Sequence, residues 1–166
     1  PITAVIKATP VASFIILVLL WFSGKNLSVI ISMLMVFPVI YMNVLEGIRS
    51  ADEKLLEMAQ VFRLSVSKKL LYIYLPAVAP FFVSACSVSL GLCWKSGIAA
   101  EVIGTPDGSI GAVFYQAKIF LQTSELLAWT VVVVAVSVAF EKLFMFLLRL
   151  ILKKLKMEDV LNGKRA

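Results

Sequence analysis

The stretch LLYIYLPAVAPFFVSACSVSLGLCW, residues 70–94, contains no aspartate, glutamate, lysine or arginine. A helix needs about 20 apolar residues to cross the ~30 Å hydrocarbon core of a bilayer, so this stretch is long enough to span a membrane. Three further stretches also lack charge, namely 8–24, 26–45 and 126–140. Lipid cannot hydrogen-bond an open sheet edge, so every span is predicted to be helical.

The first and last of these stretches reach spanning length only together with their neighbours. The first does so if its helix runs from Ile2 to Phe22, with the Lys7 side chain extended toward the headgroups. Gly24-Lys25-Asn26 follows as a tight turn, which predicts that the first two spans form a hairpin. We therefore predict an all-α, polytopic membrane helix bundle with about four spans.

The composition excludes most other classes of protein. Of the 166 residues, 61% are hydrophobic and 16% are charged, with a net charge of +6 and a mean hydropathy of +0.98. A soluble domain is less apolar and about a quarter charged, and a disordered chain is far less hydrophobic. The sequence has no histidine and two cysteines. These counts predict no metal site and no catalytic residues.

Basic residues indicate how the spans are oriented. One group lies between the second and third spans and another follows the fourth: Arg49, Lys54, Arg63, Lys68, Lys69, Lys153, Lys154, Lys156, Lys164 and Arg165. The other side holds Lys25, Lys95 and Lys118. Positive charge marks cytoplasmic loops, so the loop and the C-terminus are predicted to lie in the cytoplasm of a multi-pass protein of the cell membrane. The net charge then reflects topology, and no nucleic-acid partner is predicted.

The predicted organisation is a single membrane domain in six parts. They are two transmembrane helices in a hairpin (1–48), a cytoplasmic loop (49–76), a transmembrane helix (77–101), an extracytoplasmic loop with a short interfacial helix (102–124), a transmembrane helix (125–152) and a basic cytoplasmic tail (153–166). The chain begins with Pro1 and not with methionine, which indicates a fragment of a longer protein.

The cytoplasmic loop has a pattern of its own. Ser50-Ala-Asp-Glu53 reads as a capping box, with serine as the cap. Apolar residues then recur at helical spacing and predict one apolar face: Leu55, Leu56, Ala59 and Phe62. A second helix is predicted to start at Ser65 or Ser67 and to end at Leu75-Pro76, because proline disfavours the helical conformation in the residue before it. On pattern alone, an ordinary amphipathic hairpin at the membrane surface would explain the same residues.

This loop resembles the signature of the integral-membrane permease subunits of binding-protein-dependent ATP-binding-cassette importers. That signature is Glu-Ala-Ala, three residues, Gly, nine residues, and Ile-x-Leu-Pro. Here the same register reads Glu57-Met58-Ala59, Arg63 and Ile73-Tyr74-Leu75-Pro76, with every spacing kept. Met58 replaces an alanine and Arg63 replaces the glycine. The resemblance runs from about Lys7 to Leu155 and is closest to the nitrate, sulfonate and taurine branch.

The resemblance implies the type I importer fold, with this chain holding the last four of six spans and a two-helix coupling loop. It implies that the loop contacts a separate ATPase subunit through Glu57, Met58, Ala59, Arg63, Ser65, Leu75 and Pro76. ATP and Mg²⁺ would be bound by that ATPase, because this chain has no phosphate-binding loop and is predicted to be neither an enzyme nor a cofactor carrier. The other implied partners are a second permease copy in a homodimer, an extracytoplasmic solute-binding protein and the lipid bilayer.

The glycine position of the signature raises a conformational question at Arg63. Glycine at a bend suggests a backbone with positive φ, where any other residue pays about 1–2 kcal/mol. The bend is therefore either made differently here or strained at Arg63.

Trp94, Lys95 and Glu101, at the outer end of the third span, are the candidates for the translocation pathway. Charges at membrane depth usually face a cavity or a partner. Lys95 would suit an anionic solute. The alternatives are that Lys95 extends to the interface and that Glu101 makes a structural hydrogen bond.

These observations favour a permease subunit that carries a small solute, such as nitrate, a sulfonate or taurine. A secondary transporter is the first alternative, but it would need an internal repeat, and none is visible. A membrane scaffold without transport activity is the second, and it leaves the spacing of the loop signature unexplained.

Overall fold

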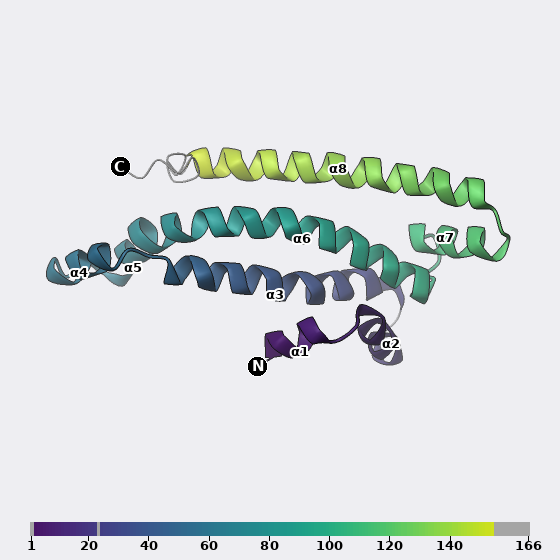
Figure 1. Cartoon of the computed structure of the whole chain (residues 1–166), viewed down its shortest axis with the longest axis horizontal. Helices are drawn as coiled ribbons and strands as arrows, with labels where there is room; N and C mark the ends of the chain where they lie inside the picture. Colours follow the sequence, from purple (N-terminus) through teal and green to yellow (C-terminus); the bar gives the residue numbers. More distant parts are fainter. Residues whose placement is uncertain (1, 23, 155–166) are drawn as a thin grey trace. The chain divides into compact units, whose positions relative to one another are not determined.

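The computed structural model describes residues 2–22 and 24–154, and within them the all-α fold class is confirmed. The helices are α1 (Ile2–Ala8), α2 (Val11–Trp21), a 3-10 helix (Gly24–Asn26), α3 (Leu27–Arg49), α4 (Glu53–Val61), α5 (Val66–Lys69), a π-helix (Leu70–Tyr74), α6 (Leu75–Gly104), α7 (Ile110–Ile119) and α8 (Thr123–Lys154) (Figure 1). Of the predicted basic tail, residues 155–166 lie outside the described residues.

In the described part of the chain, three helical segments are long and apolar enough to cross a membrane. They are Leu27–Arg49, Val66–Gly104 and Thr123–Lys154. The predicted count of four is therefore corrected, because the stretch from Ile2 to Phe22 is not one helix. It is broken at Pro10, which has an extended backbone and precedes α2. Proline disfavours helix in the residue before it, and an α2 of 11 residues is only about 16 Å long.

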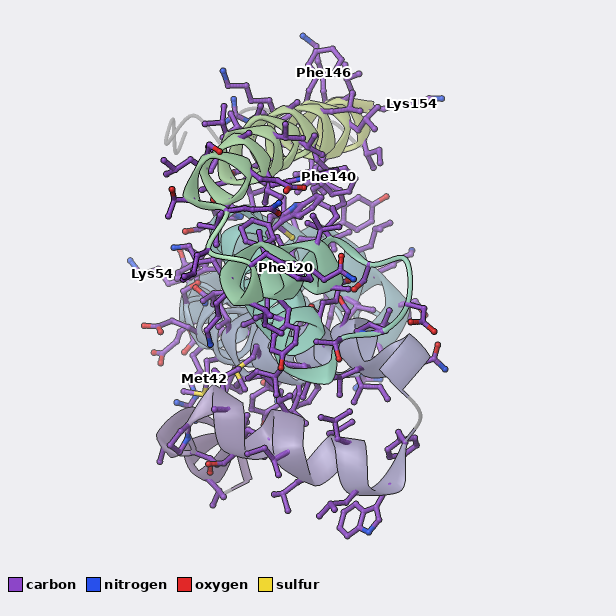
Figure 2. All side chains as sticks on the ribbon, turned by 90° about the vertical axis from the view of Figure 1, so that its right-hand side faces the viewer. Met42, Lys54, Phe120, Phe140, Phe146 and Lys154 are labelled. Atoms are coloured by element: carbon purple, nitrogen blue, oxygen red, sulfur yellow. The ribbon has the colours of Figure 1, made fainter. Side chains whose placement is uncertain are left out.

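The predicted hairpin of two membrane spans stays a prediction. The turn exists, as the 3-10 helix Gly24–Asn26. However, α2 lies crosswise to α3: Figure 1 shows α2 nearly end-on, and Figure 2 shows it running across the view. Its buried residue Ile15 packs with Leu27 and Ile31 of α3 and with Ala100 of α6. The short apolar helix α2 is thus packed against α3 and α6 in this part of the chain.

The described chain divides into two compact units. The first contains residues up to 38 together with 89–142, and the second contains 39–88 together with 143–154. The first unit has the core formed by Ile15, Leu27, Ile31 and Ala100. The second has two smaller clusters, one of Ala51, Ala59 and Ile73 and one of Ala79 and Leu152.

The helix that leads into the third predicted span does not end at Leu75-Pro76, contrary to the prediction. The helical conformation continues from α5 through the π-helix into α6, so Pro76 is the second residue of α6. Proline lacks an N–H donor and its ring presses on the preceding turn. A widened π turn directly before Pro76 gives the ring space within a continuous helix.

The sequence 102–124 was predicted to hold a loop and a short helix, and the structure has both. The helix α6 continues to Gly104, and α7 follows a loop of residues 105–109. Thr105, the residue after α6, has positive φ, and so does Leu121, the second residue after α7. Left-handed residues at these positions stop the two helices abruptly.

Candidate functional site

The helix α4 is the centre of the loop that carries the signature. Its N-cap is Asp52, whose side chain accepts a hydrogen bond of 2.9 Å from the backbone N–H of Lys54. The predicted cap, Ser50, instead donates from Oγ to the carbonyl oxygen of Gly47, at 2.9 Å. Ser50 directly follows α3 and bonds back to it, which leaves Asp52 as the extended residue before Glu53.

The bend after α4 is made at Arg63, which has a φ of 47°. The N–H of Leu64 donates to the carbonyl oxygen of Ala59 at 2.9 Å, and the N–H of Arg63 donates to that of Gln60 at 3.0 Å. This pair of bonds is the Schellman arrangement, which normally places glycine where Arg63 lies. Of the two alternatives left open by the sequence, the structure has the second: the bend keeps the geometry that glycine would favour, with Arg63 in the strained left-handed conformation.

One face of α4 is packed against the rest of its unit. Ala59 is fully buried, with an exposed fraction of 0%, and it lies in a cluster with Ala51 and Ile73 of the π-helix. Leu56 and Leu64 pack against the same cluster. The short helix is therefore capped at both ends and held along one side, which makes it a rigid element.

The rest of α4 is exposed and carries both charged and apolar side chains. Val61 is 79% exposed, Phe62 is 71% exposed and Met58 is 47% exposed. Phe62 was predicted to share one apolar face with Leu55, Leu56 and Ala59. In the structure α4 ends at Val61, and Phe62 and Leu55 are exposed whereas Ala59 is buried. Exposed apolar side chains on a rigid element are typical of an interaction surface. We call Met58, Val61 and Phe62 the α4 tip.

The remaining residues of the predicted contact set are placed unequally. Glu57, Arg63 and Ser65 are exposed, Leu75 is exposed and Pro76 is half-buried. Ala59 cannot reach a partner, because its side chain is covered by its own chain. Val61 was not among the predicted contact residues. A signal for it existed, because Val61 lies three residues after Met58 and therefore on the same side of the helix.

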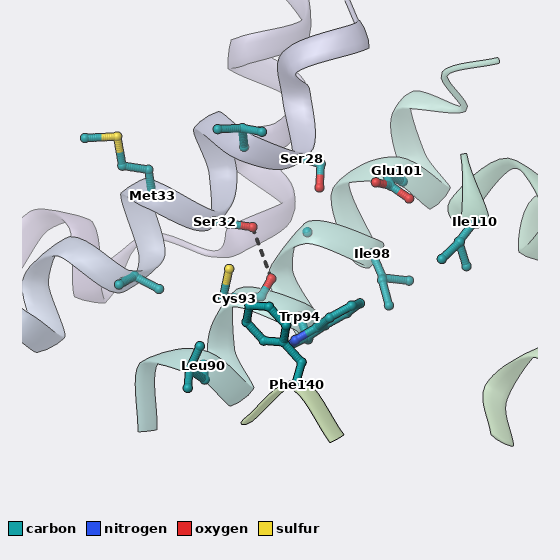
Figure 3. A pocket seen from close by; sticks show the side chains of 13 residues that line it. Ser28, Ser32, Met33, Leu90, Cys93, Trp94, Ile98, Glu101, Ile110 and Phe140 are labelled. Carbon is teal, nitrogen blue, oxygen red and sulfur yellow. Dashed lines mark hydrogen bonds between the residues drawn. The ribbon is translucent and has the colours of Figure 1, made fainter. Parts of the chain in front are cut away.

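A second candidate site is a cavity of about 600 Å³ in the first unit. Its wall is formed by α3 and α6, with Ile110 from α7 and Phe140 from α8 (Figure 3). The two long helices approach closely here at small residues. A methyl group on Gly97 would lie 2.9 Å from the Oγ atoms of Ser28 and Ser32, and Ser32 Oγ donates to the carbonyl oxygen of Cys93 at 3.1 Å.

The aromatic part of the cavity wall is a pair of rings. Trp94 and Phe140 meet edge to face, with ring centroids 6.1 Å apart and planes at 72°. This is the preferred geometry for two aromatic rings. Trp94 was predicted to line the pathway, and it lines the cavity. Phe140 was not predicted, because nothing in the sequence pairs residues so far apart.

The two charged candidates separate in the structure. Glu101 lines the cavity, and its Oε2 accepts a hydrogen bond of 3.2 Å from the backbone N–H of Gly111, the second residue of α7. Lys95 is exposed and is not among the residues that line the cavity. The structure therefore brings Trp94 and Glu101 together and leaves Lys95 apart.

Comparison with known proteins extends these findings. The family described as "Binding-protein-dependent transport system inner membrane component" matches residues 1–157. The chain is 37% identical over 135 residues to the putative aliphatic sulfonates transport permease protein of Escherichia coli (strain K12), which covers 79% of this chain and 48% of the relative. It is 29% identical over 155 residues to the protein of the same name in Bacillus subtilis (strain 168), covering 92% of this chain and 55% of that one.

A third relative is the taurine transport system permease protein of Escherichia coli (strain K12). It is 27% identical over 142 residues, which are 85% of this chain and 51% of the relative. The chain thus spans about half the length of the curated relatives it matches. With a family match over nearly its whole length and the signature loop built around α4, the chain belongs to the inner-membrane components of binding-protein-dependent transport systems.

Proposed function

We propose that the complete protein is the permease subunit of an ATP-driven importer and that this chain couples transport to a separate ATPase through α4. The observation that carries the proposal is the α4 tip, an exposed apolar surface on a helix that is capped at both ends and packed on its other side. A rigid helix transmits a displacement to the helices it is packed against. A flexible loop would absorb it.

The proposed partners follow from the same arrangement. The α4 tip suits a groove on the ATPase, with the exposed Glu57 at the rim of the contact. The ATPase would meet the loop in the cytoplasm, the side that the basic residues of the loop indicate. Delivery of solute from the other side would require a solute-binding protein, and a pathway between subunits would require a second permease copy.

We infer a small solute with an anionic group, in keeping with the names of the relatives, which refer to aliphatic sulfonates and taurine. The cavity lined by Trp94 and Glu101 is the proposed part of the pathway in this chain. Its wall is mostly apolar, which suits the alkyl part of a sulfonate, and Lys95 lies outside it, where an arriving anion would meet an exposed cation.

The proposal is tested by ATP-dependent uptake of methanesulfonate or taurine into proteoliposomes that contain the full-length permease, its ATPase and its binding protein. Uptake that requires ATP supports the proposal. Uptake driven by an ion gradient without ATP would indicate a secondary transporter. No uptake, with no stimulation of the ATPase by the binding protein, would indicate a scaffold.

Glu57 gives the first prediction. Replacing it with lysine reverses an exposed charge at the rim of the contact, and we expect uptake to fall about tenfold, because charge reversal against a complementary surface adds repulsion to the lost attraction. Glu57→Gln, which keeps the shape and removes the charge, is expected to lower uptake only about twofold to fivefold. Unchanged uptake in Glu57→Lys with a normally assembled ATPase would remove Glu57 from the coupling mechanism.

Lys95 gives the second prediction. An exposed cation attracts an anion by about 0.2–1 kcal/mol, so Lys95→Ala should raise the KM for an anionic sulfonate about twofold to fivefold and leave the maximal rate unchanged. The effect should vanish at high salt because exposed charges are screened. Lys95→Arg keeps the charge and serves as the matched control. A KM for Lys95→Ala equal to that of the parent at low salt would show that Lys95 does not attract the solute.

A further inference from the structure

The junction between α6 and α7 is made by a short set of specific contacts. Glu101 lies in the last turn of α6, and its Oε2 accepts from the N–H of Gly111 in the first turn of α7. The next N–H of α7, that of Ala112, donates to Oγ of the N-cap Ser109 at 3.1 Å. Free N–H groups and the helix dipole make a helix N-terminus favourable to a carboxylate. The first turn of α7 is therefore attached to α6 through the Glu101 side chain.

Backbone packing reinforces this attachment. Gly111 is buried, and a methyl group on its Cα would overlap the Cβ and carbonyl carbon of Glu101. The two helices thus approach so closely at this point that Gly111 meets the Cβ and the backbone of Glu101 directly. Such contact requires glycine, and it leaves the carboxylate of Glu101 within reach of one N–H donor.

The contact also bears on the cavity. Ile110, the residue before Gly111, lines the cavity together with Glu101 (Figure 3). Ile110 is the residue that α7 contributes to the wall of this cavity. A shift of the first turn of α7 away from α6 would therefore move Ile110 out of the wall and enlarge that part of the cavity.

We propose that Glu101 is a positioning residue: by accepting from the N–H of Gly111 it holds the first turn of α7 on α6 and keeps Ile110 in the cavity wall, which sets the size of solute that passes. The proposal rests on the proposed function, because it treats the cavity as part of the pathway. It assigns the Glu101 carboxylate to α7 and not to the solute, in agreement with the apolar lining around it.

The test uses three variants of the full-length permease in the assembled transporter. Glu101→Ala removes the acceptor. Glu101→Gln keeps an acceptor oxygen of the same reach. Ile110→Ala removes side-chain atoms from the wall and so enlarges the cavity, and it leaves the Glu101 acceptor in place. Hydrogen–deuterium exchange of residues 110–119 reports the attachment of α7, and the ratio of kcat/KM for pentanesulfonate to that for methanesulfonate reports the size of the pathway.

We expect Glu101→Ala to speed exchange in residues 110–119 at least tenfold and to raise the pentanesulfonate ratio about fivefold, because contacts with a few methylene groups discriminate by factors of this order. In Glu101→Gln, the exchange rate and the pentanesulfonate ratio should both stay within about twofold of the parent, because the glutamine oxygen can still accept the hydrogen bond. Ile110→Ala should raise the ratio without speeding exchange.

Two outcomes would overturn the inference. Exchange in Glu101→Ala equal to that of the parent would show that the carboxylate does not hold α7. Faster exchange with an unchanged ratio would show that the position of α7 does not set the size of the pathway. If the parent transporter imports neither sulfonate, the proposed solute class is wrong, and the exchange measurement still decides whether Glu101 positions α7.

Discussion

Replacing Val61 and Phe62 together with alanine is expected to weaken binding of the ATPase about 30-fold or more and to abolish most ATP-dependent uptake. Both side chains are largely exposed in this chain, at 79% and 71%, so their truncation removes little internal packing. Burial of an aromatic anchor in a partner's groove contributes about 2 kcal/mol or more, and this energy would be lost. The measurement is the Kd of purified ATPase for the permease in detergent, together with uptake in proteoliposomes.

The matched control for this double variant is Gln60→Ala. Gln60 is also exposed, lies on the same helix and is changed to the same residue. Its truncation removes a polar side chain from outside the α4 tip and should change the Kd less than threefold. Equal effects of Gln60→Ala and of the double variant would show that α4 responds to any change, and an unchanged Kd in the double variant would exclude the α4 tip as the contact.

The class of the fold was predictable because it depends on composition and run length. A charge-free stretch such as 70–94 has few options in lipid, and the structure has a continuous helix there. The length of a span was less predictable where one residue decides it. Pro10 breaks the segment from Ile2 to Phe22. The length of a charge-free stretch does not show this break, because hydropathy does not measure how strongly proline disfavours a helix.

Local chemistry in the loop was predicted unevenly, for a physical reason. Positive φ at Arg63 was one of two alternatives that the glycine of the signature left open, and the structure has it because the backbone requirement stays with its position when the side chain changes. The capping residue did not follow, because Ser50 and Asp52 are both good caps and the choice depends on where α3 ends. The continuation through Pro76 depends on a π turn, which has no sequence signature.

The contacts of the cavity were the least predictable. Trp94 meets Phe140, and Glu101 meets Gly111, only because α6, α7 and α8 return past one another in the first unit. The sequence grouped Lys95 with Glu101 as pathway candidates, and it could not show that Lys95 lies outside the cavity or that a backbone N–H donates to the Glu101 carboxylate. Contacts between helices depend on how the helices pack, and the periodicity of apolar residues within one helix does not predict them.

Gly47→Ala should destabilise the protein by about 1–3 kcal/mol, and Gly91→Ala should stabilise it by about 0.5–1 kcal/mol, although both replace a glycine within a membrane helix. A methyl group on Gly47 would lie 2.8 Å from Cα of Val78 and 3.3 Å from Cδ2 of Phe81. Backbone cannot yield as a flexible side chain can, so α3 and α6 must separate in the second unit. Among the described residues, no atom other than those of its chain neighbours and the nearby backbone of α6 lies within 4 Å of a methyl group on Gly91, so the gain in helix propensity is the effect that remains.

Thermal unfolding of the purified permease in detergent, followed by circular dichroism, measures both changes. Opposite shifts of the midpoint are expected, and uptake should fall only in Gly47→Ala. That variant changes the helix crossing from which α3 leads into α4, so a loss of coupling would accompany the loss of stability. A lower midpoint in both variants would mean that glycine is required for its flexibility and not for the close approach of two helices. Equal midpoints would mean that the crossing at Gly47 relaxes without strain, and the second unit could not then act as a rigid support for α4.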